Sequence, residues 1–429
     1  MSTSELPSPP TRLRPGNVPL SSLVLPETFT ESVHPDEAIK QAARQPHTWT
    51  RCPGAAFNVR CGPNYKDKRK KAPSASSLYE VFAVDVHSSD TKLAHIGRVV
   101  ALPPDPSPPP RASLPSYVII NWMVPNYAPS GLMGPKRSNG PGWNLVLYCR
   151  LSDAVRSQLA HAASGDGSAT GGAATSAAGR PASVDLLRRF MHPIDGDRLR
   201  GERLKCIMGL ADTERPSFGM VLKQLILRYN FKPFLSKTAS FCYVGPDYFE
   251  IDIDIHTWGH AALSAFNTVK EKMAALLPRV AVVVEADGDQ EMPEQVSVPL
   301  PSRLPPSAPA LTTCPLAAQV IAGVFLTNLD PARAAPINAE LAAYLSDAAN
   351  STRAFTRTRS RHTIRRPSSE ASTTPVASPV IGPADAEDFD VSGPDLTPPS
   401  RSPLPEREVD GAAKQRAEVS AASEPAEVQ

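Results

Sequence analysis

The clearest alternation of apolar and polar residues in the chain lies at 248–256. Successive side chains of an extended strand point to opposite faces, so a period of two marks a strand with one apolar face. The apolar face consists of Phe249, Ile251, Ile253 and Ile255, and the polar face of Glu250, Asp252, Asp254 and His256. We predict a half-buried strand here, with Ile251 and Ile253 in the core. They are expected to lie against Phe266 and Val269 of the helix that follows.

Other periodic segments predict the fold class. Runs of β-branched and aromatic residues at 78–86, 117–124 and 143–151 predict strands, and the apolar run 279–286 predicts a buried one. Helical spacing occurs at 184–191, 219–229 and 260–277, the last ended by Pro278. Because strands follow one another with few helices between them, we predict an α+β fold. It would be a mostly antiparallel sheet domain with a few packed helices, flanked by disordered segments.

Composition divides the chain into folded and unfolded parts. Proline makes up 47 of the 429 residues and aromatic residues only 6%, so a good part of the chain cannot bury enough apolar surface to stay ordered. We predict a disordered Pro-rich segment at 1–47, a folded domain at 48–298 and a disordered tail at 350–429. Two mobile inserts, 102–115 and 162–182, interrupt the domain. Residues 299–349 are expected to form a linker and short Ala-rich helices.

Charge and cysteine spacing exclude several classes of protein. The 45 basic and 43 acidic residues leave a formal net charge of +2, too balanced for a dedicated nucleic-acid binder. The six cysteines lie far apart and without metal-ligand spacing, so we expect no zinc site, no disulfide framework and a reducing compartment. The N-terminus is polar, and no run of about 18 apolar residues occurs. We expect a cytoplasmic protein, either soluble or peripheral on endomembranes or the plasma membrane.

A cluster of bases follows the first of three similar turns. The turn segments at 62–65, 140–143 and 245–248 share a Gly-Pro start and an aromatic fourth residue, which predicts β-turns that open the next strand, with an internal duplication as the alternative. The cluster comprises Lys66, Lys68, Arg69, Lys70 and Lys71, with Asp67 its one acid. It would suit lipid phosphate, nucleic acid or an acidic protein segment, or form a merely solvated loop. No aromatic residue is interleaved, so a stacking platform for single-stranded nucleic acid is not supported.

The acidic face of the 248–256 strand has two interpretations. Glu250, Asp252 and Asp254 could bind a divalent cation or carry out acid–base chemistry. Motifs that usually accompany such sites are absent, so an exposed or salt-bridged sheet face is favoured. On that interpretation, replacing Ile253 by Ala costs about 2–5 kcal/mol, and Asp252→Asn costs less than about 1 kcal/mol.

Catalytic motifs are missing from the sequence. It contains no nucleophile elbow, no phosphate-binding loop and no dinucleotide fingerprint. The nine histidines are scattered, and a lone one such as His95 or His256 is more often packed or on the surface than catalytic. We therefore predict no catalytic residue, no cofactor and no metal.

Seven segments together resemble one protein family. They are TWTRCPGAAFNVRCGPNYKDKRKKAPSASSLYEVFAVDV (48–86), HIGR (95–98), GPGWNLVLYCRLS (140–152), LLRRFM (186–191), ERLKCI (202–207), VGPDYFEIDIDIH (244–256) and MPEQV (292–296). In order and spacing the chain resembles the C-terminal domain of the plant Enhanced Disease Resistance 2 proteins across about 250 residues. In those proteins this domain usually follows a pleckstrin homology domain and a steroidogenic-acute-regulatory-related lipid-transfer domain. They act as negative regulators of defence-linked cell death at endomembranes and the plasma membrane.

The resemblance implies a stand-alone version of that domain, because the 47 residues before it are too few for either neighbour. It brings no functional residues to transfer. We expect a non-enzymatic, membrane-associated regulatory binding module whose basic patch contacts anionic membrane lipid or a lipid ligand. One alternative is a protein-interaction scaffold that recruits partners through phosphorylatable flanks, including the Arg-rich segment 351–366. The other is an enzyme that uses the Glu250, Asp252 and Asp254 face.

Overall fold

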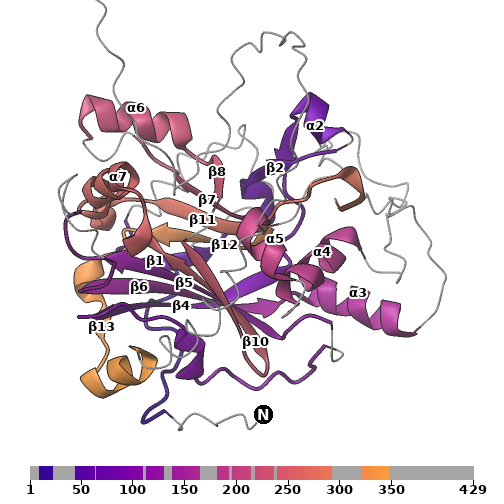
Figure 1. The fold of residues 1–429 in the computed structure, drawn as a ribbon, viewed down its shortest axis with the longest axis horizontal. Helices are drawn as coiled ribbons and strands as arrows, with labels where there is room; N and C mark the ends of the chain where they lie inside the picture. Colours follow the sequence, from indigo (N-terminus) through magenta and orange to yellow (C-terminus); the bar gives the residue numbers. More distant parts are fainter. Residues whose placement is uncertain are drawn as a thin grey trace, which may run out of the picture. The chain divides into compact units, whose positions relative to one another are not determined.

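A computed structural model of the chain describes residues 9–22, 44–62, 64–109, 113–129, 138–164, 181–192, 196–213, 218–235, 239–291 and 320–346. Two sheets dominate it (Figure 1). The five-stranded sheet has the order β1 (Thr48–Arg51), β12 (Val320–Thr327), β11 (Pro278–Val284), β7 (Leu204–Leu210) and β8 (Pro233–Leu235). The six-stranded sheet has the order β13 (Ala335–Pro336), β4 (Tyr79–Ser89), β6 (Gly142–Leu151), β5 (Tyr117–Pro125), β10 (Tyr248–Asp254) and β9 (Ser240–Val244).

Most neighbouring strands in both sheets run antiparallel. The exceptions are β10 beside β5, with Tyr248 opposite Tyr117, and the short β13 beside β4. A separate pair, β2 (Asn58–Arg60) and β3 (Lys71–Pro73), forms a small antiparallel hairpin. The predicted α+β class with a mostly antiparallel sheet is confirmed.

The main core lies between the two sheets. Trp122, Phe249, Ile251 and Ile253 of the six-stranded sheet share one cluster of buried residues with strands of the five-stranded sheet. Phe266 and Val269 pack against the same cluster, and Ile251 and Ile253 are fully buried. The predicted burial of these two isoleucines is confirmed.

A second, smaller core covers the outer face of the six-stranded sheet. Ile119 and Tyr148 of that face pack with Ile96 and with Leu341 and Leu345 of a helical turn at 339–346. Both faces of β10 are therefore buried, and the predicted half-buried strand is wrong. A strand in the middle of a sheet, covered on both sides, keeps its alternation but loses its exposed face.

Helices lie around the sheets. They are α2 (Tyr65–Lys68), α3 (Asp153–Ser164), α4 (Ala182–Met191), α5 (Gly196–Arg203), α6 (Met220–Tyr229) and α7 (His260–Lys270). The predicted helices at 184–191 and 219–229 are confirmed. The one predicted over 260–277 ends at Lys270 and continues as a short 3-10 turn, Met273–Ala275. None of the helices in the described ranges has the length and apolar character needed to span a bilayer.

One of the short Ala-rich helices expected within 299–349, around 316–325, is wrong: residues Val320–Thr327 form strand β12 (Figure 1). It pairs with β1 on one side and β11 on the other, and all its residues are buried. Alanines suggested a helix, but Val320, Ile321 and Val324 are β-branched, and Gly323 lies so close to Phe57 that a Cβ there would be 2.7 Å from the ring. The domain predicted to end at 298 thus takes a central strand from beyond that boundary.

Two predicted disordered or mobile segments are partly held in place. In the N-terminal segment, the amides of Gly16 and Asn17 donate hydrogen bonds to Asp85 over 2.7 and 2.6 Å, and Gly16 has a φ of 109° that only glycine adopts readily. In the first insert, Asp105 forms an ion pair of 2.9 Å with Arg156. Bonds to the domain therefore compensate for a composition that predicts disorder. Most of the second insert and the whole tail from 350 lie outside the described residues.

Cysteine chemistry also departs from the expectation. Cys61 is disulfide-bonded, which departs from the expected reducing compartment at this position. The other cysteines of the described ranges form no disulfide: Cys52, Cys149, Cys206 and Cys242. The positions of the cysteines in the sequence could not show which thiols lie close together in the fold.

Candidate functional site

The acidic row of β10 lies inside the protein. Glu250, Asp252 and Asp254 are each 0% exposed, so the predicted exposed face is wrong. The segment Lys92–Arg98, here called the covering segment, contacts this row from the outer side of the six-stranded sheet. Three carboxyl groups in a region that water does not reach need partners within the protein.

Backbone amides of the covering segment bind the first two acids. Glu250 accepts hydrogen bonds from the amides of Ile96 and Gly97 over 2.7 and 2.9 Å. Asp252 accepts one from the amide of His95 over 2.8 Å and one from the Asn121 side chain over 3.0 Å. Successive amides can point to the sheet because His95 takes a left-handed conformation with a φ of 53°.

An ion pair accounts for the third acid. The Lys92 ammonium lies 2.6 Å from Asp254 Oδ2, and both side chains are nearly inaccessible to water. This contact agrees with the salt-bridged version of the predicted face. Together the three acids fix the covering segment to the sheet, and this is a structural use of the carboxylates.

Burial changes the protonation of this row. Burial holds the pKa of Glu250 well above its usual range, and the adjacent Asp252 adds to the effect. Burial also raises the pKa of Asp252, to about 6, although its hydrogen bonds from Glu250, His95 and Asn121 oppose the rise. Two carboxyl groups that share a hydrogen bond in a buried place hold a proton more tightly than either would in water.

His95 is packed, as expected for a lone histidine. Its ring stacks on Tyr243 with centroids 4.1 Å apart, and its Nε2 lies 3.1 Å from the Tyr248 hydroxyl. Burial lowers the pKa of His95 to about 3, so the ring is neutral near pH 7. Within the described ranges, no group of three or more His, Cys, Asp or Glu side chains is placed to hold a metal ion.

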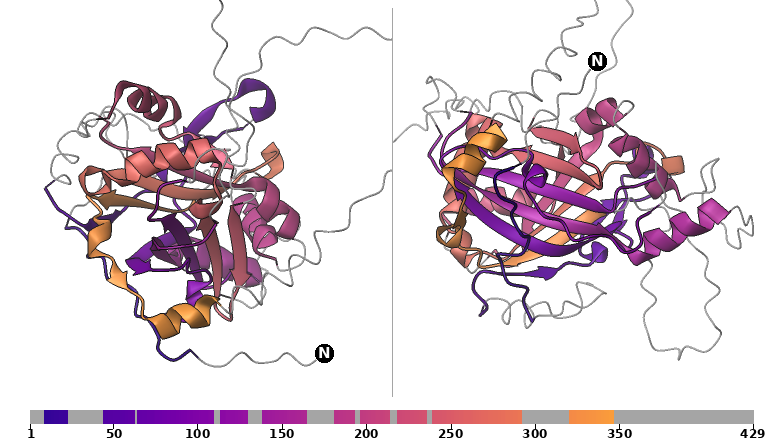
Figure 2. Two further views of the ribbon diagram at one scale, coloured as in Figure 1. Left: turned by 60° about the vertical axis from the view of Figure 1, so that its left-hand side comes forward. Right: turned by 90° about the horizontal axis from the view of Figure 1, so that it is seen from below.

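The five predicted binding bases lie on the hairpin of residues 58–73, here called the basic hairpin. It consists of β2, α2 and β3 and projects from the sheets in two views (Figures 1 and 2). Lys66, Lys68, Arg69 and Lys70 are exposed and Lys71 is half-buried. The first Gly-Pro turn therefore leads into a helical turn rather than a strand, whereas those at 140–143 and 245–248 do open β6 and β10.

Acids that the sequence places far away lie beside the basic hairpin. Arg60 pairs with Glu285, Lys66 with Asp287 at 3.2 Å, and the amide of Asn64 donates to Asp289 over 2.7 Å. Hydrogen bonding to Lys66 lowers the pKa of Asp287. These contacts offset part of the positive charge that the sequence suggested.

The tip of the hairpin keeps its charge. Lys68, Arg69 and Lys70 are consecutive and exposed at the end of α2. Below them, the buried Tyr65 ring lies under the Arg60 guanidinium at 4.7 Å, an arrangement that stabilises the turn. The tip is therefore a compact group of three cations on a fixed base.

A third charged cluster was not found by the sequence reasoning. Glu291 accepts hydrogen bonds from Arg189 over 2.9 Å and Arg203 over 2.5 Å, and from the amide of Asp287 over 2.8 Å. Burial alone would raise the pKa of Glu291, but these donors lower it below its usual value. The bases belong to LLRRFM and ERLKCI, and only the fold brings them to one acid.

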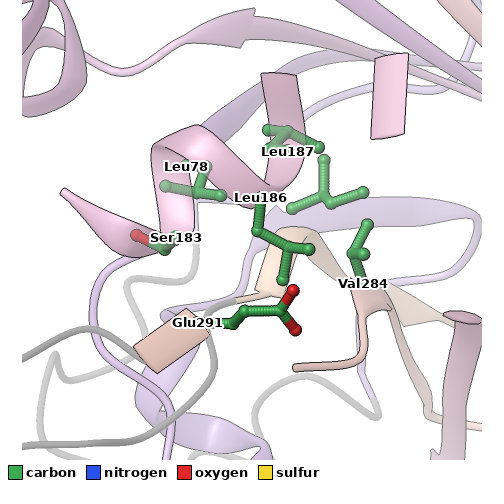
Figure 3. Close-up of a pocket in the computed structure, with 7 residues that line it drawn as sticks. Leu78, Ser183, Leu186, Leu187, Val284 and Glu291 are labelled. Atoms are coloured by element: carbon green, nitrogen blue, oxygen red, sulfur yellow. The ribbon is translucent and has the colours of Figure 1, made fainter. Parts of the chain in front are cut away.

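A small cavity borders this cluster (Figure 3). It is lined by Leu78, Ser183, Leu186, Leu187, Val284, Glu291 and Ile321. The volume in which the centre of a water-sized sphere can move is about 10 Å³. This is enough for about one water molecule. This cavity does not hold a lipid chain.

Comparison with known families shows which family the chain belongs to. A family model described as Protein ENHANCED DISEASE RESISTANCE 2, C-terminal, matches residues 49–298. The chain belongs to this family. Searches of curated proteins and of solved structures each returned no match.

The fold explains why separate segments of this Enhanced Disease Resistance 2 C-terminal domain act together. The covering segment contains HIGR, and β10 contains YFEIDID. The two meet through the hydrogen bonds of Glu250 and Asp252. The matched region ends before β12, so the five-stranded sheet needs residues from outside the family match.

Proposed function

We propose that this chain is a non-enzymatic binding module with a regulatory role, and that the tip of its basic hairpin binds anionic membrane lipid. The observation that carries the proposal is the exposure of Lys68, Arg69 and Lys70 together at the end of a projecting hairpin. Anionic headgroups attract such a tip electrostatically. Arg60 and Lys66 of the hairpin pair with acids, so the tip is the part that remains for a partner.

The remaining chemistry of the domain favours binding over catalysis. The acids of β10 hold the covering segment, and Glu291 holds two arginines. Burial raises the pKa of Cys52 to about 12 and that of Cys206 further, which keeps both thiols protonated. These side chains stabilise the fold, and this use of them supports a binding role.

The strength of the tip sets a requirement. At about 1 kcal/mol per base near an anionic surface, three bases supply roughly 3 kcal/mol before screening. A dissociation constant of about 1 mM corresponds to about 4 kcal/mol. The tip alone therefore gives weak, salt-sensitive attachment.

Co-sedimentation with vesicles tests the proposal. The purified chain should pellet with vesicles of phosphatidylcholine and phosphatidylserine and much less with phosphatidylcholine alone. Lys68→Ala/Arg69→Ala/Lys70→Ala should lose most of this binding. A matched control, Arg12→Ala/Arg14→Ala/Arg150→Ala, removes three exposed bases elsewhere and should keep it. Equal pelleting with both vesicles, or equal loss in both variants, would contradict the proposal.

The scaffold alternative concerns the flanks. The Arg-rich segment 351–366 lies outside the described residues, so recruitment of partners there remains a prediction from the sequence.

A further inference from the structure

Helix α6 exposes apolar side chains to solvent. The exposed fractions are 82% for Met220, 85% for Val221, 41% for Leu225 and 46% for Leu227. These four are among the six large apolar residues found exposed in the described ranges, the others being Leu20 and Val244. The exposed positions of α6 are 220, 221, 224, 225, 227 and 228, a spacing that forms one helix face.

A helix on the surface of a water-soluble domain normally turns a polar stripe outward. α6 is apolar on both sides, since its inner residue Ile226 packs against the main core. Its outer face carries only Gln224 and Arg228 as polar residues, and the helix contains no acid. Exposed apolar side chains gathered on one helix face in this way mark an interaction site for a protein or a membrane.

The helix is held firmly at its C-terminal end. The Asn230 side chain exchanges two hydrogen bonds with the backbone of Leu210, over 2.7 and 3.1 Å. The amide of Phe231 donates to the Met208 carbonyl over 3.1 Å, and the Arg279 guanidinium lies 4.2 Å from the Phe231 ring centre. These bonds tie the end of α6 to strand β7, so the outward presentation of its apolar face is built into the fold.

The position of α6 indicates what covers it. α6 and the basic hairpin project on the same side of the sheets, the upper side in Figure 1 and in the left view of Figure 2. A flat anionic surface can therefore meet both at once. The negative charge of an anionic membrane complements the hairpin tip and Arg228, and the membrane interior accepts apolar side chains. Stable attachment of a peripheral protein commonly needs two such weak signals together.

We infer that α6 is a membrane-inserting helix whose outer face, Met220, Val221, Leu225 and Leu227, enters the apolar boundary of an anionic bilayer beside the basic hairpin. This inference rests on the proposed function and adds the apolar half of the contact. Lipid is chosen over a protein groove because of the shared side with the cationic tip and the absence of acids on the helix.

Tryptophan quenching tests the insertion directly. The four native tryptophans, Trp49, Trp122, Trp143 and Trp258, are all buried, so a new exposed one reports on its own position. Val221→Trp should be quenched by phosphatidylcholine–phosphatidylserine vesicles with brominated acyl chains. Val244→Trp is the matched control, because Val244 is an exposed valine on β9 of the six-stranded sheet. Its fluorescence should be quenched no more than that of the unaltered chain.

A second pair of variants measures the contribution to binding. Val221→Ser/Leu225→Ser should weaken vesicle binding by about tenfold, whereas Val244→Ser should leave it unchanged. Because the altered residues are exposed, both variants should keep the melting temperature of the unaltered chain.

The outcomes separate the two proposals. If the Val221→Trp variant binds anionic vesicles but its fluorescence is quenched no more than that of the unaltered chain, the role of α6 is overturned and that of the hairpin stands. If the chain does not bind anionic vesicles, both fail. Sedimentation equilibrium gives a further decision: a dimer that Val221→Ser/Leu225→Ser dissociates, without an effect on vesicle binding, would show that a second copy covers α6.

Discussion

Asp252 accepts a hydrogen bond from the backbone amide of His95 over 2.8 Å, although the two residues are 157 positions apart in the chain. The carboxylate has 0% exposure, and its other oxygen accepts from Asn121. A side chain in such a place must be judged by the donors it satisfies rather than by its charge. This raises the expected cost of substitutions on the acidic face of β10.

Asp252→Asn should destabilise the domain by roughly 1–3 kcal/mol, because an amide group replaces one acceptor and leaves a buried N–H of His95 or Asn121 without a partner. Ile253→Ala should cost about 2–5 kcal/mol through lost burial and a cavity. Denaturant unfolding of both variants measures the two costs. A loss below about 0.5 kcal/mol for Asp252→Asn would restore the solvated-face interpretation.

The same aspartate should give a pH dependence of known sign. Burial raises the pKa of Asp252 from 3.8 to about 6, so the folded state holds a proton that the unfolded state releases. The stability that this proton contributes is fully present below the pKa of Asp252 in the unfolded state. It is lost as the pH rises through the pKa of Asp252 in the folded state. We expect the free energy of unfolding of the unaltered chain, minus that of Asp252→Asn, to fall between about pH 4 and pH 7.

The subtraction matters for this measurement. Glu291 has a lowered pKa and contributes stability that is lost in the opposite direction, as the pH falls. It is present in both proteins, so its effect cancels in the difference. Glu250 shares a hydrogen bond with Asp252 and is affected by the substitution, so the difference reports on the pair. A difference that is flat across this range would contradict the raised pKa of the pair.

Gly97→Ala should destabilise the domain by about 1–3 kcal/mol through overpacking. An added Cβ would lie 2.6 Å from the Tyr248 ring and 2.8 Å from Glu250 Oε2 and from Ile119. Gly201→Ala in α5 is the control, since a Cβ there meets nothing within 4 Å, and it should be neutral or slightly stabilising. The two substitutions should shift the melting temperature in opposite directions or by clearly different amounts. Equal melting temperatures would contradict the close packing of the covering segment.

Truncation tests where the domain ends. A chain cut after residue 298 lacks β12, which lies between β1 and β11, and should fail to give a cooperative melt. A chain cut after residue 346 keeps every described strand and should melt like the full chain. A folded 1–298 fragment would show that β12 is dispensable. Any test of recruitment by the tail should accordingly use the later cut.

Sequence reasoning found the strands whose composition is distinctive. β4, β5, β6, β10 and β11 are dense in β-branched or aromatic residues and were placed close to their bounds. β7 was missed because LKCIMGL has no alternation when both faces are covered, and β12 because its alanine and glycine suggested a helix. Periodicity reports on local burial and cannot show which strand is central.

The candidate sites were also predictable from the sequence only in part. The basic residues of the hairpin were readable as a run, yet the acids that contact Arg60, Asn64 and Lys66 come from 285–289. The acids of β10 were readable as a row, yet their donors lie in the covering segment. A pattern of charges in the sequence shows the residues on one side of a contact. Only the fold shows which residues they pair with.

The pairing of β1 with β12 has a consequence for synthesis of the chain. Thr48 pairs with Thr327, and at ribosomal rates of roughly 5–20 residues per second the two are made about 15–55 s apart. Until β12 emerges, β1 lacks its partner in the sheet and β11 has an open edge, each a template for intermolecular pairing. Closure of the five-stranded sheet is therefore a late event in biosynthesis, and conditions that slow translation near residue 320 should extend the period in which the nascent chain is vulnerable to aggregation.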